Sequence, residues 1–176
     1  MDFASTPSPK QTATTKATLY LICGKIAAGK STFARKLSEQ VQTVLISEDF
    51  WLANLYPGQI KSLEDYARCS AQLRAAMAAH IADLLRAGVS VVLDFPSNTL
   101  ATRAWARGLI EQSAAAHELH YLDVSDQICK ARLHARNAGG EHPFETTEAQ
   151  FDLFSRYFVA PQESEGFQII HHPVTE

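Results

Sequence analysis

A glycine-bearing stretch near the start of the chain has the residue types and spacing of a phosphate-binding loop. From Gly24 to Ser31 the sequence matches GxxxxGK[ST]. Glycines let the backbone turn tightly and approach phosphate oxygens, and successive backbone N–H groups then bind the anion at a helix N-terminus. In this motif Lys30 reaches the β- and γ-phosphates of a nucleoside triphosphate, and Ser31 offers its hydroxyl to Mg²⁺. The alternative is an ordinary glycine turn beside a surface lysine.

Carboxylates follow two further apolar runs of the sequence. Asp94 comes directly after 91–93, and a carboxylate at a strand end can hold Mg²⁺, usually through water; the alternative is a helix cap or a turn residue. Glu48 and Asp49 follow the run 43–47. In a kinase a carboxylate near the γ-phosphate orients the acceptor hydroxyl and takes its proton. We predict that Asp49 does this; the alternative is that Asp49 caps the following turn and Glu48 is solvated.

Aromatic side chains cluster directly after these acids, at Phe50, Trp51 and Tyr56. They either wall a pocket for the acceptor or pack a helix onto the sheet, and the sequence leaves both interpretations open. We expect the acceptor pocket to be built from the loop after Asp49 and from the helix after Asp94.

Two arginines, Arg132 and Arg136, are four residues apart on a predicted helix and therefore share a face. A polar, glycine-bearing segment, 137–142, follows, and then another helix begins. Helix, flexible loop and helix form a lid, whose closure brings cations to the transferring phosphoryl group and excludes water. One arginine then stacks on adenine and the other reaches phosphate. The alternative is two solvated arginines; Arg103 is a further candidate for the cleft.

The expected cofactors are ATP and Mg²⁺, and the expected site residues fall into three groups. The catalytic group is Lys30, Asp49 and Arg136, and the metal is expected at Ser31 and Asp94. The nucleotide is expected to contact Gly24, Lys25, Ile26, Ala27, Ala28, Gly29, Lys30, Ser31, Thr32 and Arg132.

These residues need a scaffold, and the apolar runs indicate one. Strands are expected at 18–23, 43–47, 89–93, 120–124 and, more weakly, 167–170. Helical stretches lie between and after them, at 30–40, 63–87, 99–115, 125–137 and 147–158. Alternating strands and helices predict an α/β domain with a parallel sheet of about five strands. Ligands bind such a sheet at the carboxyl ends of its strands, which is where the motifs lie.

Composition indicates one ordinary globular domain of 176 residues. With 46% hydrophobic and 20% charged residues, a disordered or fibrous chain is excluded. The net charge of −3 argues against a dedicated nucleic-acid binder. Residues 1–17 have almost no apolar anchors, so we expect a disordered tail there and the domain at 18–176.

Cysteine usage and hydropathy indicate a reduced, cytoplasmic setting without a membrane partner. The three cysteines, Cys23, Cys69 and Cys129, form no CxxC pair. No apolar stretch is long enough to cross a bilayer, and no signal peptide is recognisable. The histidines form no ligand set with cysteine, and the pair at 171–172 is expected in a terminal tail. Cys23 is expected to be a small packing residue.

Taken together, these residues resemble a small P-loop kinase of the AAA-type ATP-binding group, similar to chloramphenicol phosphotransferase, zeta toxin and the kinase domain of polynucleotide kinase. The resemblance covers about 19–167 and includes Asn98, Thr99 and Arg103 after Asp94. It implies a three-layer α/β/α P-loop NTPase fold, nucleotide-kinase-like, with a helical lid. It also implies an acceptor-orienting role for Asp49 and nucleotide contacts for the paired lid arginines.

Three functions remain open at this stage. The first is transfer of the γ-phosphate of ATP to a hydroxyl of a small molecule. The second is a polynucleotide 5′-hydroxyl kinase, which the acidic net charge disfavours, as does Ser47-Glu48 where such kinases tend to carry a basic residue. The third is a nucleotide-gated binding module with little or no phosphotransfer. The sequence names neither the acceptor nor the oligomeric state.

Overall fold

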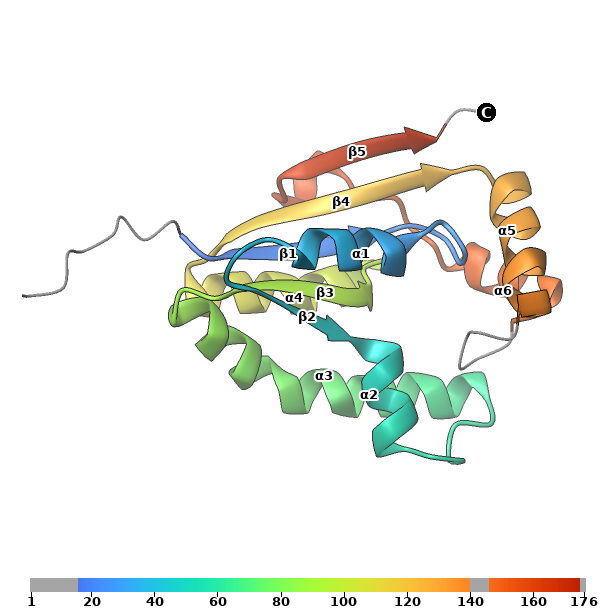
Figure 1. Ribbon diagram of the computed structural model, residues 1–176, viewed down its shortest axis with the longest axis horizontal. Coiled ribbons are helices and arrows are strands. Elements are labelled where there is room, and N and C mark those ends of the chain that lie inside the picture. Colours follow the sequence, from blue (N-terminus) through green and yellow to red (C-terminus); the bar gives the residue numbers. More distant parts are fainter. Residues whose placement is uncertain (1–15, 140–145, 175–176) are drawn as a thin grey trace, which may run out of the picture.

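Five parallel strands form the centre of the structure, a computed structural model that describes residues 16–139 and 146–174. The sheet order is β2-β3-β1-β4-β5. In chain order the strands are β1 (Thr18–Cys23), β2 (Thr43–Ser47), β3 (Ser90–Pro96), β4 (Ala116–Val124) and β5 (Ile169–Val174). All carboxyl ends therefore lie at one edge, which is the right-hand side of Figure 1.

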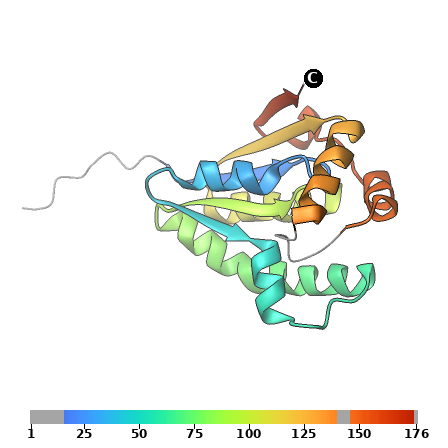
Figure 2. The same ribbon diagram turned by 45° about the vertical axis from the view of Figure 1, so that its right-hand side comes forward.

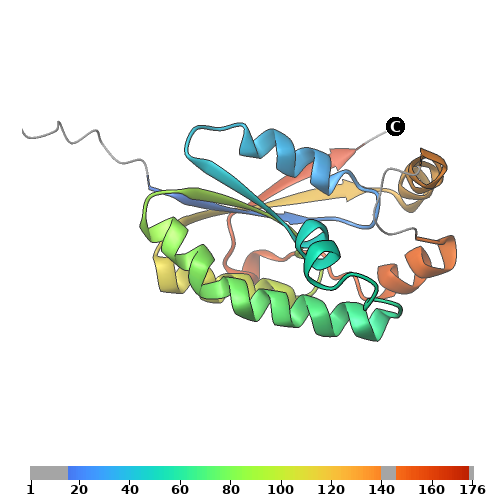
Figure 3. The ribbon, with the colours of Figure 1, turned by 60° about the horizontal axis from the view of Figure 1, so that its bottom comes forward.

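Helices cover both faces of the sheet and its carboxyl edge. They are α1 (Lys30–Ser38), α2 (Glu48–Leu55), α3 (Leu63–Arg86), α4 (Leu100–Ser113), α5 (Asp126–Gly139) and α6 (Glu148–Arg156), followed by a 3₁₀ turn, η1 (Glu163–Glu165). Figure 3 shows α1 on one face and α3 and α4 on the other. Figures 1 and 2 show α5 and α6 beyond the carboxyl ends of the strands. The α/β/α fold with a parallel sheet is confirmed.

The central strand β1 is buried on both sides, which explains its unbroken apolar sequence. Leu19 and Leu21 belong to the core shared with α3 and α4. Tyr20 and Ile22 point to the opposite core, which α1, α5 and α6 cover. Because successive side chains of a strand alternate in direction, one short strand contributes to two separate cores.

Two elements differ from the sequence expectations. The segment after Glu48 is helix α2 rather than a loop: Ser47 caps it by accepting a hydrogen bond from the Phe50 N–H, and the two acids occupy its first turn. His171 and His172 lie in β5 rather than in a tail, because β5 pairs with β4 as far as Val174.

Parts of two predicted segments fall outside the described residues. Of the predicted tail, 1–15 lies outside them, while Ala17 is buried and its carbonyl accepts a hydrogen bond from Ala116 N–H. Of the predicted lid loop, 140–145 lies outside them, and α5 itself continues to Gly139. Within 16–139 and 146–174, no helix has the length and apolarity that crossing a membrane requires.

Candidate active site

The phosphate loop joins β1 to α1, and its glycines are required by geometry. Gly29 has φ 101° at the N-cap of α1, in the left-handed region that favours glycine. A Cβ on Gly24 would lie 3.0 Å from the Leu122 carbonyl oxygen and 3.2 Å from the Ala28 Cβ. The spacing of the two glycines is therefore set by a left-handed turn at one end and a close approach to β4 at the other.

Lys30 arches back over the loop. Its Nζ donates to the carbonyl oxygens of Gly24 and Lys25, both at 2.8 Å. Burial lowers the pKa of the Lys30 ammonium, and Asp94 and Asp49 oppose this shift. Lys25 extends the other way and pairs with Asp126 at the start of α5. Of the two cations of the loop, Lys30 thus lies over the loop itself, and Lys25 lies against α5, the helix predicted to begin the lid.

Asn98, which follows β3, holds the first glycine of the loop. Its Oδ1 accepts from the Gly24 N–H and its Nδ2 donates to the Gly24 carbonyl, both at 2.9 Å. One side chain therefore satisfies both backbone groups of the first glycine. The sequence placed Asn98 only within a resemblance; the structure gives it a role, because its amide accepts at Oδ1 and donates from Nδ2 at the same time.

Asp94 and Ser31 come together at the end of β3. The Ser31 hydroxyl donates to Asp94 Oδ1 at 3.2 Å. Burial raises the pKa of the Asp94 carboxyl, Asp49 adds to the rise, and Ser31, Lys30 and Arg35 oppose it. The largest cause is burial, so the Asp94 carboxylate is poorly hydrated where it lies.

A hydroxyl and a buried carboxylate 3.2 Å apart fit Mg²⁺, which prefers oxygen ligands and usually takes only one or two from protein. The described residues contain no group of three or more His, Cys, Asp or Glu that could hold a metal ion. A magnesium held by this pair would therefore need phosphate oxygens and water to complete its coordination.

Asp49 lies in the first turn of α2 and is half-buried. Its charge adds to the rise in the pKa of Asp94 and opposes the lowering of the pKa values of Lys30 and Arg136. Groups from the phosphate loop, β3 and the lid helix therefore all lie within electrostatic reach of Asp49.

Glu48, the neighbour of Asp49, is one of the most buried charged residues, with 1% of its surface exposed. Its carboxylate accepts from Tyr66 Oη at 2.8 Å, from Arg74 Nη1 at 3.1 Å and from Ser70 Oγ. Burial raises the pKa of Glu48 despite these partners. Glu48 is therefore not solvated: it fixes the first turn of α2 to α3.

Of the two arginines predicted for the lid, only Arg132 contacts the phosphate loop. Arg132 Nη1 donates to the Ala28 carbonyl of the phosphate loop at 3.3 Å. Arg136 Nη2 lies 3.5 Å from Thr146 Oγ1, and its Nε is buried without a hydrogen-bond partner among the described residues. Burial lowers the pKa of Arg136, opposed by Asp49. Arg132 thus contacts the loop directly, whereas Arg136 lies within electrostatic reach of Asp49 on α2.

Arg103 does not face the cleft. It is fully buried, forms two hydrogen bonds with Glu165, at 2.6 and 2.9 Å, and donates to the carbonyls of Ser97 and Val159. Its charge fastens the segment after α6 to α4. The cleft hypothesis for Arg103 is wrong because the segment that supplies Glu165 and Val159 covers it, and its sequence position gives no sign of that contact.

Cys23 and the histidines take no part in this site. Cys23 is buried, and burial raises the pKa of its thiol to about 12, so it acts as a packing residue. His120 and His172 contact each other at 3.0 Å between β4 and β5.

Comparisons with known proteins identify the family and the fold of the chain. The profile of a family described as AAA domain matches residues 19–161. The chain matches no curated protein at a significant level. Among solved structures it is similar to a candidate kinase from Chloroflexus aurantiacus J-10-fl, with a TM-score of 0.73 and 19% identity over 90% of this chain and 89% of that one.

Two further structures share the fold. One is the Mycobacterium tuberculosis APS kinase CysC in complex with AMPPNP and APS, with a TM-score of 0.52 and 24% identity over 72% of this chain and 76% of that one. The other belongs to the Pnkp1/Rnl/Hen1 RNA repair complex, with a TM-score of 0.58 and 18% identity over 82% of this chain and 45% of that one. These likenesses show a common kinase-like fold.

Proposed function

Because the chain belongs to the AAA domain family and has the fold of P-loop kinases, we propose that it is an ATP-dependent phosphotransferase. In this proposal it moves the γ-phosphate of ATP to a hydroxyl group of a small molecule. Asp49 orients or deprotonates that hydroxyl, and Lys30 and Arg136 stabilise the transferring group.

The position of Asp49 is the observation that carries the proposal. Asp94 already supplies the carboxylate that a bound metal requires, so binding ATP alone needs no second acid near Lys30. Yet the charge of Asp49 acts on Lys30, Asp94 and Arg136. A carboxylate within reach of all three suits an acceptor hydroxyl that loses its proton late in phosphoryl transfer.

The remaining residues divide the work as follows. Backbone N–H groups of the loop and the Lys30 ammonium bind the β- and γ-phosphates. Arg132, already bonded to the Ala28 carbonyl, covers the loop from the lid side. Ser31 and Asp94 would hold Mg²⁺, which neutralises charge on the phosphate oxygens when bound. Asp49 receives the proton of the acceptor.

A small-molecule acceptor is supported by the acidic net charge of −3 and by the absence of a basic residue at Ser47-Glu48. The APS kinase of similar fold is named for a small acceptor, whereas another similar structure belongs to an RNA repair complex. Salt separates the two classes: transfer to an RNA end weakens steeply as salt rises, because phosphate contacts release counterions, and transfer to a neutral small molecule does not.

The test is the Asp49→Asn variant, assayed with γ-labelled ATP and a panel of hydroxylated small molecules. We expect transfer to fall by about 10²–10⁴-fold, since a positioned general base contributes that much. The affinity for an ATP analogue, measured by calorimetry, should stay within about 2-fold, because the nucleotide is held by the loop. The matched control is Asp83→Asn, which changes an exposed acid near the end of α3.

Two results would overturn the proposal. Unchanged transfer in Asp49→Asn would remove the acceptor-orienting role. A crystal structure with AMPPNP and Mg²⁺ in which protein fills the space between the γ-phosphate and Asp49 would favour a nucleotide-gated binding module instead.

A further inference from the structure

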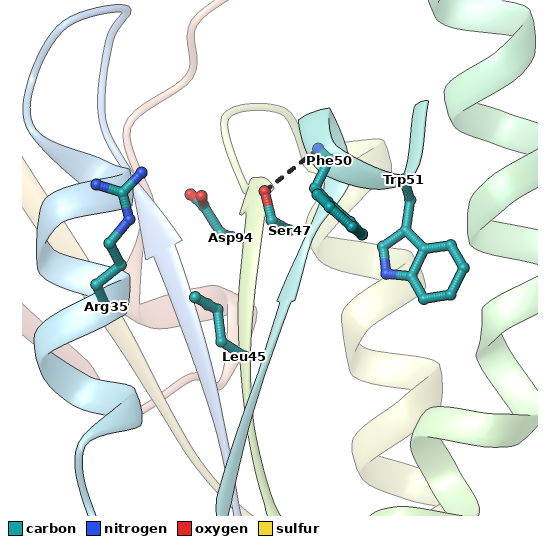
Figure 4. A pocket seen from close by; sticks show the side chains of 6 residues that line it. All are labelled: Arg35, Leu45, Ser47, Phe50, Trp51 and Asp94. Carbon is teal, nitrogen blue, oxygen red and sulfur yellow. Dashed lines mark hydrogen bonds between the residues drawn. The ribbon is translucent and has the colours of Figure 1, made fainter. Parts of the chain in front are cut away.

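A pocket of about 430 Å³ lies between α1 and α2, at the carboxyl ends of β2 and β3. Figure 4 shows Arg35 and Asp94 on one side of it and Phe50 and Trp51 on the other. The lining residues are Arg35, Leu45, Ser47, Phe50, Trp51 and Asp94. Sites for small molecules usually measure about 300–1,000 Å³, so this pocket has the size for a compact ligand.

The pocket adjoins the residues proposed to transfer phosphate. Asp94 lines the pocket and also accepts the hydrogen bond from Ser31 of the phosphate loop. Phe50 lines it from the first turns of α2, one residue after Asp49. An occupant of the pocket is therefore next to Asp94, and Asp49 is the residue before one that lines the pocket. The pocket lies at the β2 and β3 end of the sheet order, whereas α5 follows β4.

Arg35 is the one cation among the described residues that line the pocket. It is exposed, and lies one helical turn after Ser31 on the same face of α1. Its carbonyl accepts a hydrogen bond from the Ser38 hydroxyl, but in the described part of the chain its guanidinium makes no hydrogen bond or ion pair; the guanidinium charge acts on Asp94. A guanidinium is a planar fork of donors that matches a carboxylate or a phosphate. A solvated arginine is the plain alternative, but this one stands in the wall of a pocket.

The opposite wall is aromatic and in part uncovered. Phe50 is 62% exposed, and its ring meets Trp51 edge to face at a centroid distance of 6.2 Å and an interplanar angle of 86°. Trp51 is partly buried and packs against the main core, so it forms a fixed support. A ligand with an apolar or planar part would remove the Phe50 ring from water, which is favourable.

We propose that this pocket binds the phosphoryl acceptor, and that the acceptor is a small anionic hydroxyl compound with an apolar or planar part. This inference rests on the proposed phosphotransferase function. Arg35 pairs with the carboxylate or phosphate of the acceptor, and Phe50 and Trp51 cover its ring. The acceptor oxygen forms a bond to the γ-phosphorus of ATP, the bond from that phosphorus to the β–γ bridging oxygen breaks, ADP leaves with the electron pair, and the hydroxyl proton passes to Asp49.

Matched pairs of acceptors test the charge. The pairs are gluconate with glucose and adenosine 3′-monophosphate with adenosine, each assayed with γ-labelled ATP. We expect the anionic member of a pair to be phosphorylated in preference to its neutral partner. In Arg35→Ala the KM for that anion should rise by about 10–100-fold, since a hydrogen bond to a charged group contributes that much, while the KM for ATP is unchanged. Lys36→Ala, an exposed cation on the same helix, is the control and should behave as the parent chain.

A binding measurement separates failure of this inference from failure of the proposed function. The chain has two tryptophans, so in Trp105→Phe the fluorescence reports Trp51 alone. We expect adenosine 3′-monophosphate to change this signal in the presence of AMPPNP and Mg²⁺, and Arg35→Ala to weaken that binding. Such binding without transfer to any acceptor overturns the proposed function and leaves the pocket only as a binding site for an anionic ligand.

The opposite results overturn the pocket assignment and leave the kinase standing. These are transfer to neutral acceptors as efficient as to anionic ones, or an Arg35→Ala variant with an unchanged KM for the anion. A 5′-hydroxyl oligonucleotide phosphorylated in preference to every small compound would overturn the small-molecule class.

Discussion

The cleft that we propose has a nucleotide half, at the phosphate loop, and an acceptor half, at the pocket between α1 and α2. The two halves are built differently. The nucleotide half is made chiefly of backbone: Lys30 and Asn98 bond to the carbonyl and N–H groups of Gly24 and its neighbour Lys25. The acceptor half is made of side chains, among them Arg35 and Phe50, which are largely exposed. The contacts of the first half are made to main-chain atoms, whereas those of the second depend on which side chains stand there.

The adjacent acids Glu48 and Asp49 show how the acceptor half keeps its position. Glu48 is bonded by Tyr66, Ser70 and Arg74 of α3, whereas the charge of Asp49 acts on the phosphate loop. One acid anchors the turn of α2, and the next is the one that we propose orients the acceptor. The following predictions test this division between a backbone-built half and a side-chain-built half.

The largest effect is expected from Lys30→Ala. Removing the cation that reaches the β- and γ-phosphates should lower transfer by about 10³-fold, as losing a donor to the developing charge does elsewhere. ATP affinity should fall too, because the nucleotide half is where the change lies. Initial rates and calorimetry measure both, with Lys36→Ala as the control. A Lys30→Ala variant with normal rates would end the phosphate-loop assignment.

Glu48→Ala should act on the acceptor half alone. It leaves Arg74 without its carboxylate and opens space in a buried network, so the free energy of unfolding should fall by about 3 kcal/mol. Transfer should fall because the turn that carries Asp49 loses its anchor, while ATP affinity is kept. Urea unfolding and calorimetry check this. Equal losses in ATP affinity and transfer would mean that the two halves are not separate.

The pH dependence of stability should distinguish Glu48 from Glu165, the glutamate that pairs with Arg103. Burial raises the pKa of Glu48, so its contribution to stability is present below the unfolded pKa of about 4.3 and is lost as pH rises through the folded pKa. Burial also acts to raise the pKa of Glu165, but Arg103 and Arg107 outweigh it and lower that pKa. Its contribution is therefore present above about 4.3 and is lost as pH falls through the folded pKa.

The two glutamine variants should consequently differ in opposite directions with pH. Compared with the parent chain, Glu48→Gln should cost more stability in acid than at neutral pH, and Glu165→Gln should cost more at neutral pH than in acid. Urea unfolding across that pH range measures both. Two slopes of the same sign would contradict the assigned environments.

Asn98→Ala should affect the nucleotide half and leave the acceptor half intact. The Gly24 N–H and carbonyl would lose their partner, which costs about 2 kcal/mol for buried groups. We expect lower thermal stability and weaker ATP binding with an unchanged KM for the acceptor. Gln72→Ala on the exposed side of α3 is the control. A shift in acceptor KM alone would place Asn98 in the wrong half.

Gly29→Ala should have the smallest effect on this scale. A Cβ there meets no atom within 4 Å, so the cost comes from φ 101° alone, about 1–2 kcal/mol. Thermal unfolding measures the loss. Gly88→Ala, at φ 85° after α3, has equally open space and should cost a similar amount without changing ATP affinity. If Gly29→Ala also leaves ATP affinity unchanged, the loop does not need its left-handed turn to bind phosphate.

The sequence by itself determined the phosphate loop and the sheet around it. The spacing of Gly24, Gly29, Lys30 and Ser31, with apolar runs on either side, predicted the turn from β1 into α1, the parallel sheet and the edge at which the candidate site residues gather. These follow from local rules: backbone freedom at glycine, burial of a strand on both faces and the direction of parallel strands.

Only the tertiary structure decided the roles of residues whose partners are distant in sequence. It showed that residues 48–55 form helix α2 and that Glu48 is buried against α3. It also showed that Arg103 pairs with Glu165, 62 residues away. It also brought Arg35 of α1 to the same pocket as Phe50 of α2. A charged side chain reads the same in sequence whether water or a distant partner surrounds it, because burial and pairing are properties of the packed chain.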